Sequence, residues 1–120
     1  MKPKYHFYSN TIYALSGLKA MIKNERSFKI ELFIITPLFI AIWFLPLSSI
    51  EQIILGMSLL FILAMECVNS AIEACIDLVS PDFHPLAKVA KDCGSAAVFI
   101  SICAAVLAWG VILFGAVSNA

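Results

Sequence analysis

Three long apolar stretches, separated by short polar segments, dominate the pattern along this chain. They run from about Ile30 to Leu45, from Ile50 to Val79 and from Val89 to Val117. A helix that crosses a bilayer needs about 20 predominantly apolar residues. The second and third stretches exceed this length, and the first reaches it only with its flanks. The pattern therefore predicts three membrane-spanning helices, at about residues 28–47, 50–79 and 87–117.

A shorter segment before these stretches, at about residues 5–24, has the pattern of an amphipathic helix. Its apolar side chains, from Phe7 to Ile22, recur at helical spacing and fall on one face, whereas Lys19 and Lys23 can reach lipid headgroups. A helix of this kind lies in the membrane interface or packs on the protein itself. Both descriptions can hold at once.

Two short linkers join the predicted spans. Residues 46–49 contain Ser48 and Ser49, and either hydroxyl can cap the N-terminus of the following helix. Residues 80–85 contain two prolines, which prevent one continuous helix through this segment. The second and third spans are therefore expected to be antiparallel neighbours.

The composition supports a small integral membrane protein of one domain, residues 1–120. Apolar residues make up 62% of the chain and charged residues 13%, whereas soluble domains are about half apolar and one quarter charged. Eight basic and eight acidic residues give no net charge, so we expect no nucleic-acid partner. The four cysteines include no CxxC pair, and we expect free thiols.

The basic residues indicate how the spans are oriented. Lys2, Lys4, Lys19, Lys23, Arg26 and Lys29 precede the first span, and Lys88 and Lys91 open the third. All eight therefore lie on one side, which the positive-inside rule assigns to the cytoplasm. The N-terminus and the polar end of the second helix are expected there, and the C-terminus outside.

The second predicted helix carries a stripe of polar residues on one face. Glu66, Asn69, Ser70, Glu73 and Asp77 have helical spacing and fall within an arc roughly 100° wide, at about 100° per residue. Acidic residues within a span are costly and usually mark a functional site. For Asp77 the alternative is a helix end that simply emerges into water.

The third predicted helix begins with a complementary set, Lys88, Lys91, Asp92 and Ser95, again on one face. Because the two helices are expected to be antiparallel, this set should lie at the depth of the acidic end of the stripe. Carboxylates bind magnesium and lysine offsets phosphate charge, so the arrangement suits a metal–nucleotide complex. The alternative is a group of ion pairs that bury each other. The five glycines form no phosphate-binding loop, so side chains and metal would have to bind the nucleotide.

The stretch from Glu66 to Asp77, ECVNSAIEACID, resembles the ExxNxAxExxxD signature of the prokaryotic diacylglycerol kinase family, whose close relatives are the undecaprenol kinases. The following segment HPLAKVAKD continues the match, as do Asn24, Glu25 and the size of the chain. The resemblance covers nearly the whole chain. It implies an all-α protein of the bacterial cytoplasmic (inner) membrane, a homotrimer of three-span subunits with an N-terminal surface helix. Its active sites would be shared between neighbouring subunits.

The resemblance also implies roles for individual residues. Glu66 matches the general base that takes the proton from the lipid hydroxyl, and Glu25 and Glu73 match the carboxylates that hold the magnesium of MgATP. Further matches to the nucleotide site are Tyr13, Asp82, His84, Asp92 and Lys91, the last on phosphate. Matches to the lipid side are Asn69, Ser95 and Trp109 and, more weakly, Asn10, Lys19 and Glu31. His6 stands where several relatives have an arginine near the nucleotide, so we expect a weaker, pH-sensitive contact there.

The expected function is accordingly a Mg²⁺-dependent kinase that uses ATP to convert diacylglycerol into phosphatidate. The segment Gly94–Ala97 and Trp109 resemble the diacylglycerol kinases, whereas His84–Lys88 fits the undecaprenol kinases equally well, so undecaprenol is the alternative substrate. A small ion or proton channel and a non-catalytic membrane assembly subunit are remote alternatives. Between Ile53 and Met65 the only polar side chain is Ser58, which argues against a pore.

Overall fold

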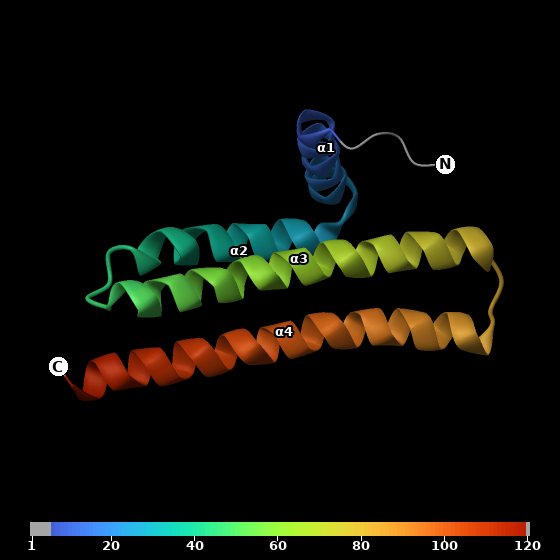
Figure 1. The fold of residues 1–120 in the computed structure, drawn as a ribbon. Helices are drawn as coiled ribbons and strands as arrows, with labels where there is room; N and C mark the ends of the chain where they lie inside the picture. Colours follow the sequence, from blue (N-terminus) through green and yellow to red (C-terminus); the bar gives the residue numbers. More distant parts are fainter. Residues whose placement is uncertain (1–5, 120) are drawn as a thin grey trace.

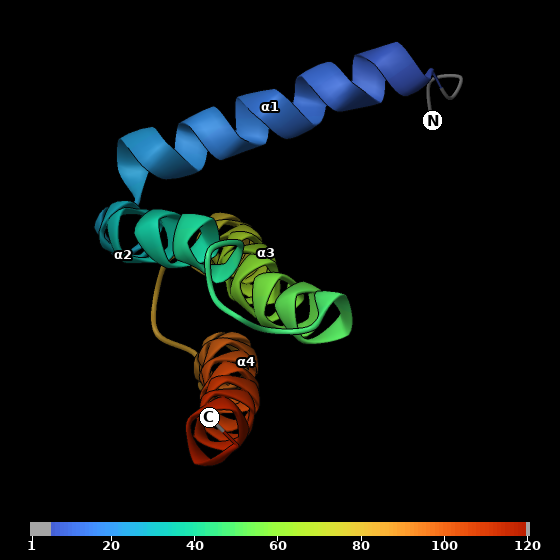
Figure 2. The ribbon, with the colours of Figure 1, turned by 90° about the vertical axis from the view of Figure 1, so that its left-hand side faces the viewer.

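The computed structural model describes residues 6–119, and over this range the protein is built from α-helices without strands. The helices are α1 (Phe7–Asn24), α2 (Arg26–Ile42), α3 (Ser49–Val79) and α4 (Pro85–Ser118). Helices α2, α3 and α4 run alongside one another, and α1 crosses them on one side (Figures 1 and 2). The all-helical class is therefore confirmed. The expected start of the first helix at Tyr5, and Lys2 and Lys4 of the orientation argument, lie outside the described residues.

Helices α3 and α4 are long and apolar enough to cross a membrane. Their 31 and 34 residues correspond to about 46 and 51 Å at about 1.5 Å per residue. The hydrocarbon core of a bilayer is only about 30 Å thick. Both helices therefore extend well beyond it, and their polar ends meet at the linker that joins them.

Helix α2 is shorter than the apolar segment in which it lies. Its 17 residues span about 25 Å, and the helix ends at Ile42 although the apolar sequence continues. The N–H groups of Trp43, Phe44 and Leu45 donate to carbonyls three residues earlier, which closes tight turns instead of continuing the α-helix. Pro46 explains this end, because it has no N–H to donate to the Ile42 carbonyl, its ring would clash with that carbonyl, and it disfavours the helical conformation in Leu45.

The two linkers hold the starts of α3 and α4 through side-chain caps. Ser48 Oγ accepts a hydrogen bond from Glu51 N–H, while the Glu51 carboxylate accepts one from Ser48 N–H. This reciprocal cap confirms Ser48 as the N-cap of α3. At α4, His84 Nδ1 accepts from Leu86 N–H, and Pro85 occupies the first helical position, where it needs no donor.

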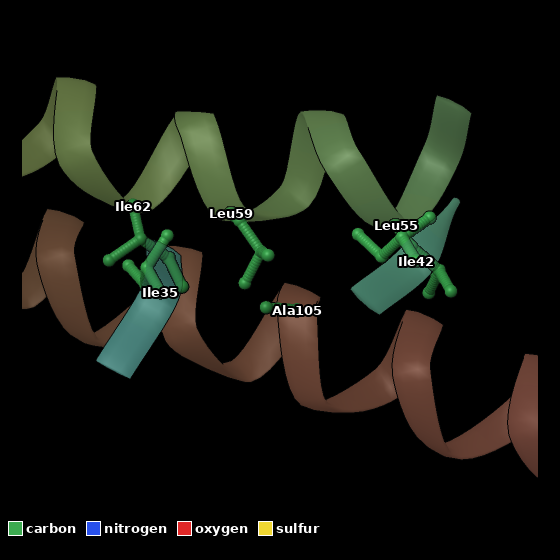
Figure 3. Packing of buried hydrophobic residues seen from close by; sticks show 6 residues of the cluster. All are labelled: Ile35, Ile42, Leu55, Leu59, Ile62 and Ala105. Atoms are coloured by element: carbon green, nitrogen blue, oxygen red, sulfur yellow. The ribbon is translucent and has the colours of Figure 1, made fainter. Parts of the chain in front are cut away.

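The buried core lies where α2, α3 and α4 run together. Leu55, Leu59 and Ile62 point from α3 toward the other two helices, as Figure 3 shows. The full cluster consists of Ile35, Ile42, Leu55, Leu59, Ile62 and Ala105. Outside it the apolar surface is largely open, since only 22% and 17% of the most apolar windows of α3 and α4 are buried within the chain. Apolar surface on this scale suits contact with lipid or with neighbouring chains.

Helix α1 packs against the middle of the bundle rather than along it. Met21 is its buried residue, and a groove between α1 and α3 is lined by Gly17 and Leu18 on one side and by Cys67 and Ser70 on the other. The last turns of α3 and the first turns of α4, at the linker that joins them, extend past α1, as Figure 1 shows. This is the arrangement expected of a surface helix that lies beside the polar half of a membrane bundle.

Candidate active site

The polar ends of α3 and α4 are joined by an ion pair between the two helices. Lys91 Nζ lies 2.6 Å from Asp77 Oδ1, and on α4 itself Lys88 Nζ lies 2.7 Å from Asp92 Oδ2. Lys91 thus lies at the depth of the acidic stripe, as the antiparallel arrangement predicted. The side chains are between 40% and 66% exposed, so these pairs do not bury each other. They remain accessible to a ligand from the aqueous side.

A polar pocket of about 380 Å³ opens beside these pairs, at the linker between α3 and α4. Two further hydrogen bonds shape its rim: Ser80 Oγ donates to the Asp82 carbonyl, and His84 caps α4. Lysines in such a pocket can bind phosphate oxygens, while the carboxylates can accept hydrogen bonds or bind a cation. The charged and imidazole side chains in its lining are Asp77, Asp82, His84, Lys88, Lys91 and Asp92.

Deeper along α3, the carboxyl groups of Glu66 and Glu31 meet between α3 and α2. Glu66 is half-buried, and Glu31 Oε2 is fully enclosed without a hydrogen-bond donor among residues 6–119. Two facing carboxylates repel each other unless a proton or a cation lies between them. The structure thus places two acidic side chains together inside a predominantly apolar part of the chain.

Asn69 lies one turn from Glu66, against the backbone of α4. Its Oδ1 is buried and has no hydrogen-bond donor within residues 6–119. The neighbouring residue on α4 is Gly94, where an added Cβ would collide with the Asn69 amide. Because Gly94 has no side chain, α3 and α4 can approach closely here, and the Asn69 amide packs against the α4 backbone. Ser95, the next residue on α4, is exposed.

An apolar groove of about 420 Å³ begins at Glu31 and runs between α2, α3 and α4. Ile35 and Leu59 form part of its wall, and Trp109 lines it on α4. Apart from Glu31 and the Trp109 indole, the side chains that line the groove are aliphatic. The groove is therefore suited to a hydrocarbon chain, with a carboxyl group at one end.

Comparison with known proteins identifies the family. Residues 12–113 match the sequence model of the prokaryotic diacylglycerol kinases. The chain belongs to the prokaryotic diacylglycerol kinase family. It is 41% identical to the diacylglycerol kinase of Haemophilus influenzae over 109 residues, which cover 91% of this chain and 92% of the relative. The diacylglycerol kinase of Pseudomonas aeruginosa is 39% identical, over 88% of this chain and 85% of its own length. That of Escherichia coli K12 is 38% identical, with 85% and 84% covered.

The diacylglycerol kinase signature thus occupies the half of α3 that connects the apolar groove to the polar pocket. Its first residue, Glu66, lies beside the groove residue Glu31, and its last, Asp77, lines the pocket. A single chain thus forms both the groove and the pocket, and α3 lines part of each. Trp109 and Glu31 both line the groove, and Asp82, His84, Lys91 and Asp92 meet in the pocket.

Other candidate residues lie outside both hollows. His6, Asn10, Tyr13 and Lys19 are exposed on or beside α1, and His6 and Asn10 also precede residue 12, where the match to the family model begins. Glu25 is half-buried at the junction of α1 and α2, and Glu73 is exposed on α3. Neither hollow is lined by any of these six residues.

Glu25 and Glu73 are the candidate magnesium ligands of the chain. Across residues 6–119, no group of three or more His, Cys, Asp or Glu side chains is close enough together to hold a metal ion. Magnesium bound to a nucleotide needs fewer protein ligands, because it takes one or two carboxylates together with phosphate oxygens and water. Within residues 6–119, Glu25 and Glu73 could therefore meet magnesium only together with phosphate oxygens and water.

Two residues of the hollows had no individual role in the sequence analysis. Lys88 was placed there only on the face of Lys91 and Asp92; in the structure it lines the polar pocket and pairs with Asp92, a contact that its i, i+4 spacing signals. Ser58 accepts a hydrogen bond from Trp109 in the groove wall. Its only signal in the sequence was that it is the one polar residue in a long apolar run.

Proposed function

We propose that this protein is an ATP-dependent lipid kinase that transfers the γ-phosphate of MgATP to the hydroxyl of diacylglycerol and releases phosphatidate. The observation that supports it most is the place of Glu66 between an apolar groove and a polar pocket that contains two lysines. A lipid kinase needs this combination, because one substrate is a hydrocarbon and the other carries several phosphates. Positioning and charge neutralisation account for most of the catalysis of phosphoryl transfer.

In the proposed reaction Glu66 accepts the proton of the lipid hydroxyl. The hydroxyl oxygen then forms a bond to the γ-phosphorus, the bond between this phosphorus and the β,γ-bridging oxygen breaks, and ADP leaves. Lys91 offsets the negative charge of the phosphates, and Asp92, Asp82, His84, Tyr13 and His6 contact the nucleotide. Asn69, Ser95 and Trp109, together with Glu31, Asn10 and Lys19, contact the lipid.

Magnesium would be held by Glu25 and Glu73 together with the phosphates of ATP. Bound there, it would neutralise charge on the phosphate oxygens. Both carboxylates belong to the aqueous side of the chain: Glu25 follows α1, and Glu73 is exposed on α3 one turn before Asp77. Removal of divalent cations should therefore abolish turnover.

The proposal includes a homotrimer in the bacterial inner membrane, with α2 as a third span and the active sites on the cytoplasmic side. One chain leaves Glu73 and the apolar faces of α3 and α4 open. Polar groups in a membrane must be covered by protein or water, so a neighbouring subunit is the natural cover. The basic residues of α1 and of the first turns of α4 favour the cytoplasm for this side.

Mixed trimers test the shared sites. Glu66→Gln and Asp92→Asn are each expected to be inactive. If one site takes Glu66 and Asp92 from different chains, some mixed trimers contain an intact site, and activity returns when the two variants are assembled together. Verified mixed trimers without recovered activity would place both residues of a site on one chain. The kinase assignment would survive that result.

The alternative substrate is undecaprenol, because the segment His84–Lys88 resembles the undecaprenol kinases as closely as the diacylglycerol kinases. The decisive experiment offers diacylglycerol and undecaprenol in competition to the purified protein with MgATP, and identifies the phosphorylated lipid. Phosphatidate as the main product supports the proposal, and undecaprenyl phosphate supports the alternative. A protein that turns over neither lipid, but conducts ions in vesicles, would be a channel instead.

A further inference from the structure

Trp109 reaches a hydrogen-bond partner that lies well inside α3 rather than at its end. Its hydrogen-bond partner Ser58 is nine residues beyond the start of α3, which is about 14 Å along the helix axis. Tryptophans gather at the membrane surface, because there the indole N–H can reach water. Within the apolar bundle this N–H needs a protein acceptor, since an unpaired donor there is costly.

Ser58 provides this acceptor. Trp109 Nε1 donates to Ser58 Oγ at 3.1 Å, across a sequence separation of 51 residues. Ser58 Oγ in turn donates to the Leu55 carbonyl at 2.6 Å. A hydroxyl carries one donor and two acceptor positions, so it can make both bonds at once. The chain Trp109–Ser58–Leu55 thus fixes the edge of the indole to the backbone of α3.

The Trp109 side chain also forms part of the groove wall. Trp109 packs against the buried cluster that includes Leu59 and Ala105, and it lines the groove that begins at Glu31. One hydrogen bond and this packing together fix the orientation of the ring. Without the bond the indole would be held by packing alone, on a surface of the groove.

Ser101 on α4 is a serine in an apolar helix that bonds only within its own helix, and it serves as a comparison for Ser58. Its hydroxyl is buried and donates to the Val98 carbonyl at 2.6 Å, the same contact within the helix that Ser58 makes. Among residues 6–119 it makes no side-chain hydrogen bond to another helix. Bonding of this kind within the helix explains why a serine is tolerated, but it does not explain the contact between Ser58 and Trp109.

We propose that Ser58 is a positioning residue that holds the Trp109 indole in the wall of the apolar groove and thereby sets the affinity for the lipid substrate. The inference rests on the proposed function, in which Trp109 contacts the lipid. Ser58 itself need not touch the lipid. Its effect should therefore appear in the KM for the lipid and leave the KM for MgATP and kcat at saturating lipid unchanged.

The first arm of the test follows the indole directly. Trp43 and Trp109 are the two tryptophans of the chain, so in a Trp43→Phe background the tryptophan emission comes from Trp109 alone. Phe39 contacts Trp43 edge to face at a centroid distance of 5.9 Å, and a phenylalanine keeps an aromatic ring there. In this background Ser58→Ala should lower the fluorescence anisotropy and shift the emission to the blue, because the ring loses its hydrogen bond. Ser101→Ala is the matched control and should change neither quantity.

The second arm measures kinetics with a short-chain diacylglycerol and MgATP. Ser58→Ala should raise the KM for the lipid about three- to tenfold, the effect of one hydrogen bond in such a setting. Ser58→Thr should restore it, because a threonine hydroxyl can make the same bonds. Ser101→Ala should leave both KM values within about twofold of the unchanged protein, as substitutions without a special role usually do.

Three results would overturn the inference: unchanged anisotropy in Ser58→Ala, changed anisotropy with an unchanged lipid KM, or equal effects of Ser58→Ala and Ser101→Ala. The last would mean that both serines act only through general packing. If the unchanged protein does not phosphorylate diacylglycerol at all, the proposed function fails, and with it the effect on lipid affinity. The fluorescence arm would then still decide whether Ser58 holds Trp109.

Discussion

The substitution Glu66→Gln keeps the size of the side chain and removes its ability to take a proton from a lipid hydroxyl. A positioned general base typically contributes about 10²- to 10⁴-fold to the rate, which corresponds to about 3–5 kcal/mol of transition-state stabilisation. We therefore expect kcat to fall at least about a hundredfold. Affinity for MgATP should change little, because Asp77 in the polar pocket is eleven residues further along α3, or about 16 Å.

The structure also predicts the effect of this substitution on stability. Glu31 Oε2 is enclosed next to Glu66 and has no donor among the described residues. An amide at position 66 removes one of two adjacent carboxylates and supplies an N–H that can donate to this oxygen. A hydrogen bond of this kind contributes about 1 kcal/mol. Glu66→Gln should therefore unfold at the same temperature as the unchanged protein or at a higher one.

Three measurements on the purified protein in micelles check this prediction: turnover of diacylglycerol with MgATP, nucleotide binding by calorimetry, and thermal unfolding. Loss of activity with retained nucleotide affinity and stability is the expected combination. Turnover within tenfold of the unchanged protein would remove Glu66 from the role of base. A large fall in unfolding temperature would instead show that the carboxylate stabilises the bundle, and that Glu31 and Glu66 do not repel each other there.

Further predictions concern the metal ligands, the contact between α3 and α4, and the thiols. Glu25→Gln and Glu73→Gln should each raise the magnesium concentration needed for half-maximal turnover at fixed ATP, and an unchanged requirement in both would exclude them as ligands. Gly94→Ala should lower the unfolding temperature and the activity, because the added Cβ would collide with the Asn69 amide. Gly110→Ala, with open space around it, should change neither. Equal unfolding temperatures of the two variants would show that α3 and α4 can shift apart without cost. Replacement of all four free cysteines by alanine or serine should leave measurable turnover, since the mechanism uses no thiolate; an inactive but folded variant would mean that a step is missing.

The sequence by itself determined the helices and their polar faces. The length of the apolar stretches, the serine before α3 and the prolines around residue 85 are local signals, and each acts within a turn or two of the chain. Helical spacing likewise placed Glu66, Asn69 and Asp77 on one stripe of α3 without reference to any other helix. The family signature lies in the same residues. The early end of α2 at Ile42 was missed, although Pro46 is a local signal for it.

Only the tertiary structure decided which residues meet across helices. Periodicity fixes the face on which a residue lies, but it leaves open how far each helix is rotated and shifted against its neighbours. Packing of Ile35 and Ile42 against Leu55 and Leu59 sets both quantities. From that packing follow the contact of Glu31 with Glu66, the choice of Asp77 as the partner of Lys91, and the bond between Ser58 and Trp109. These contacts join distant parts of the chain, so no local pattern could have specified them.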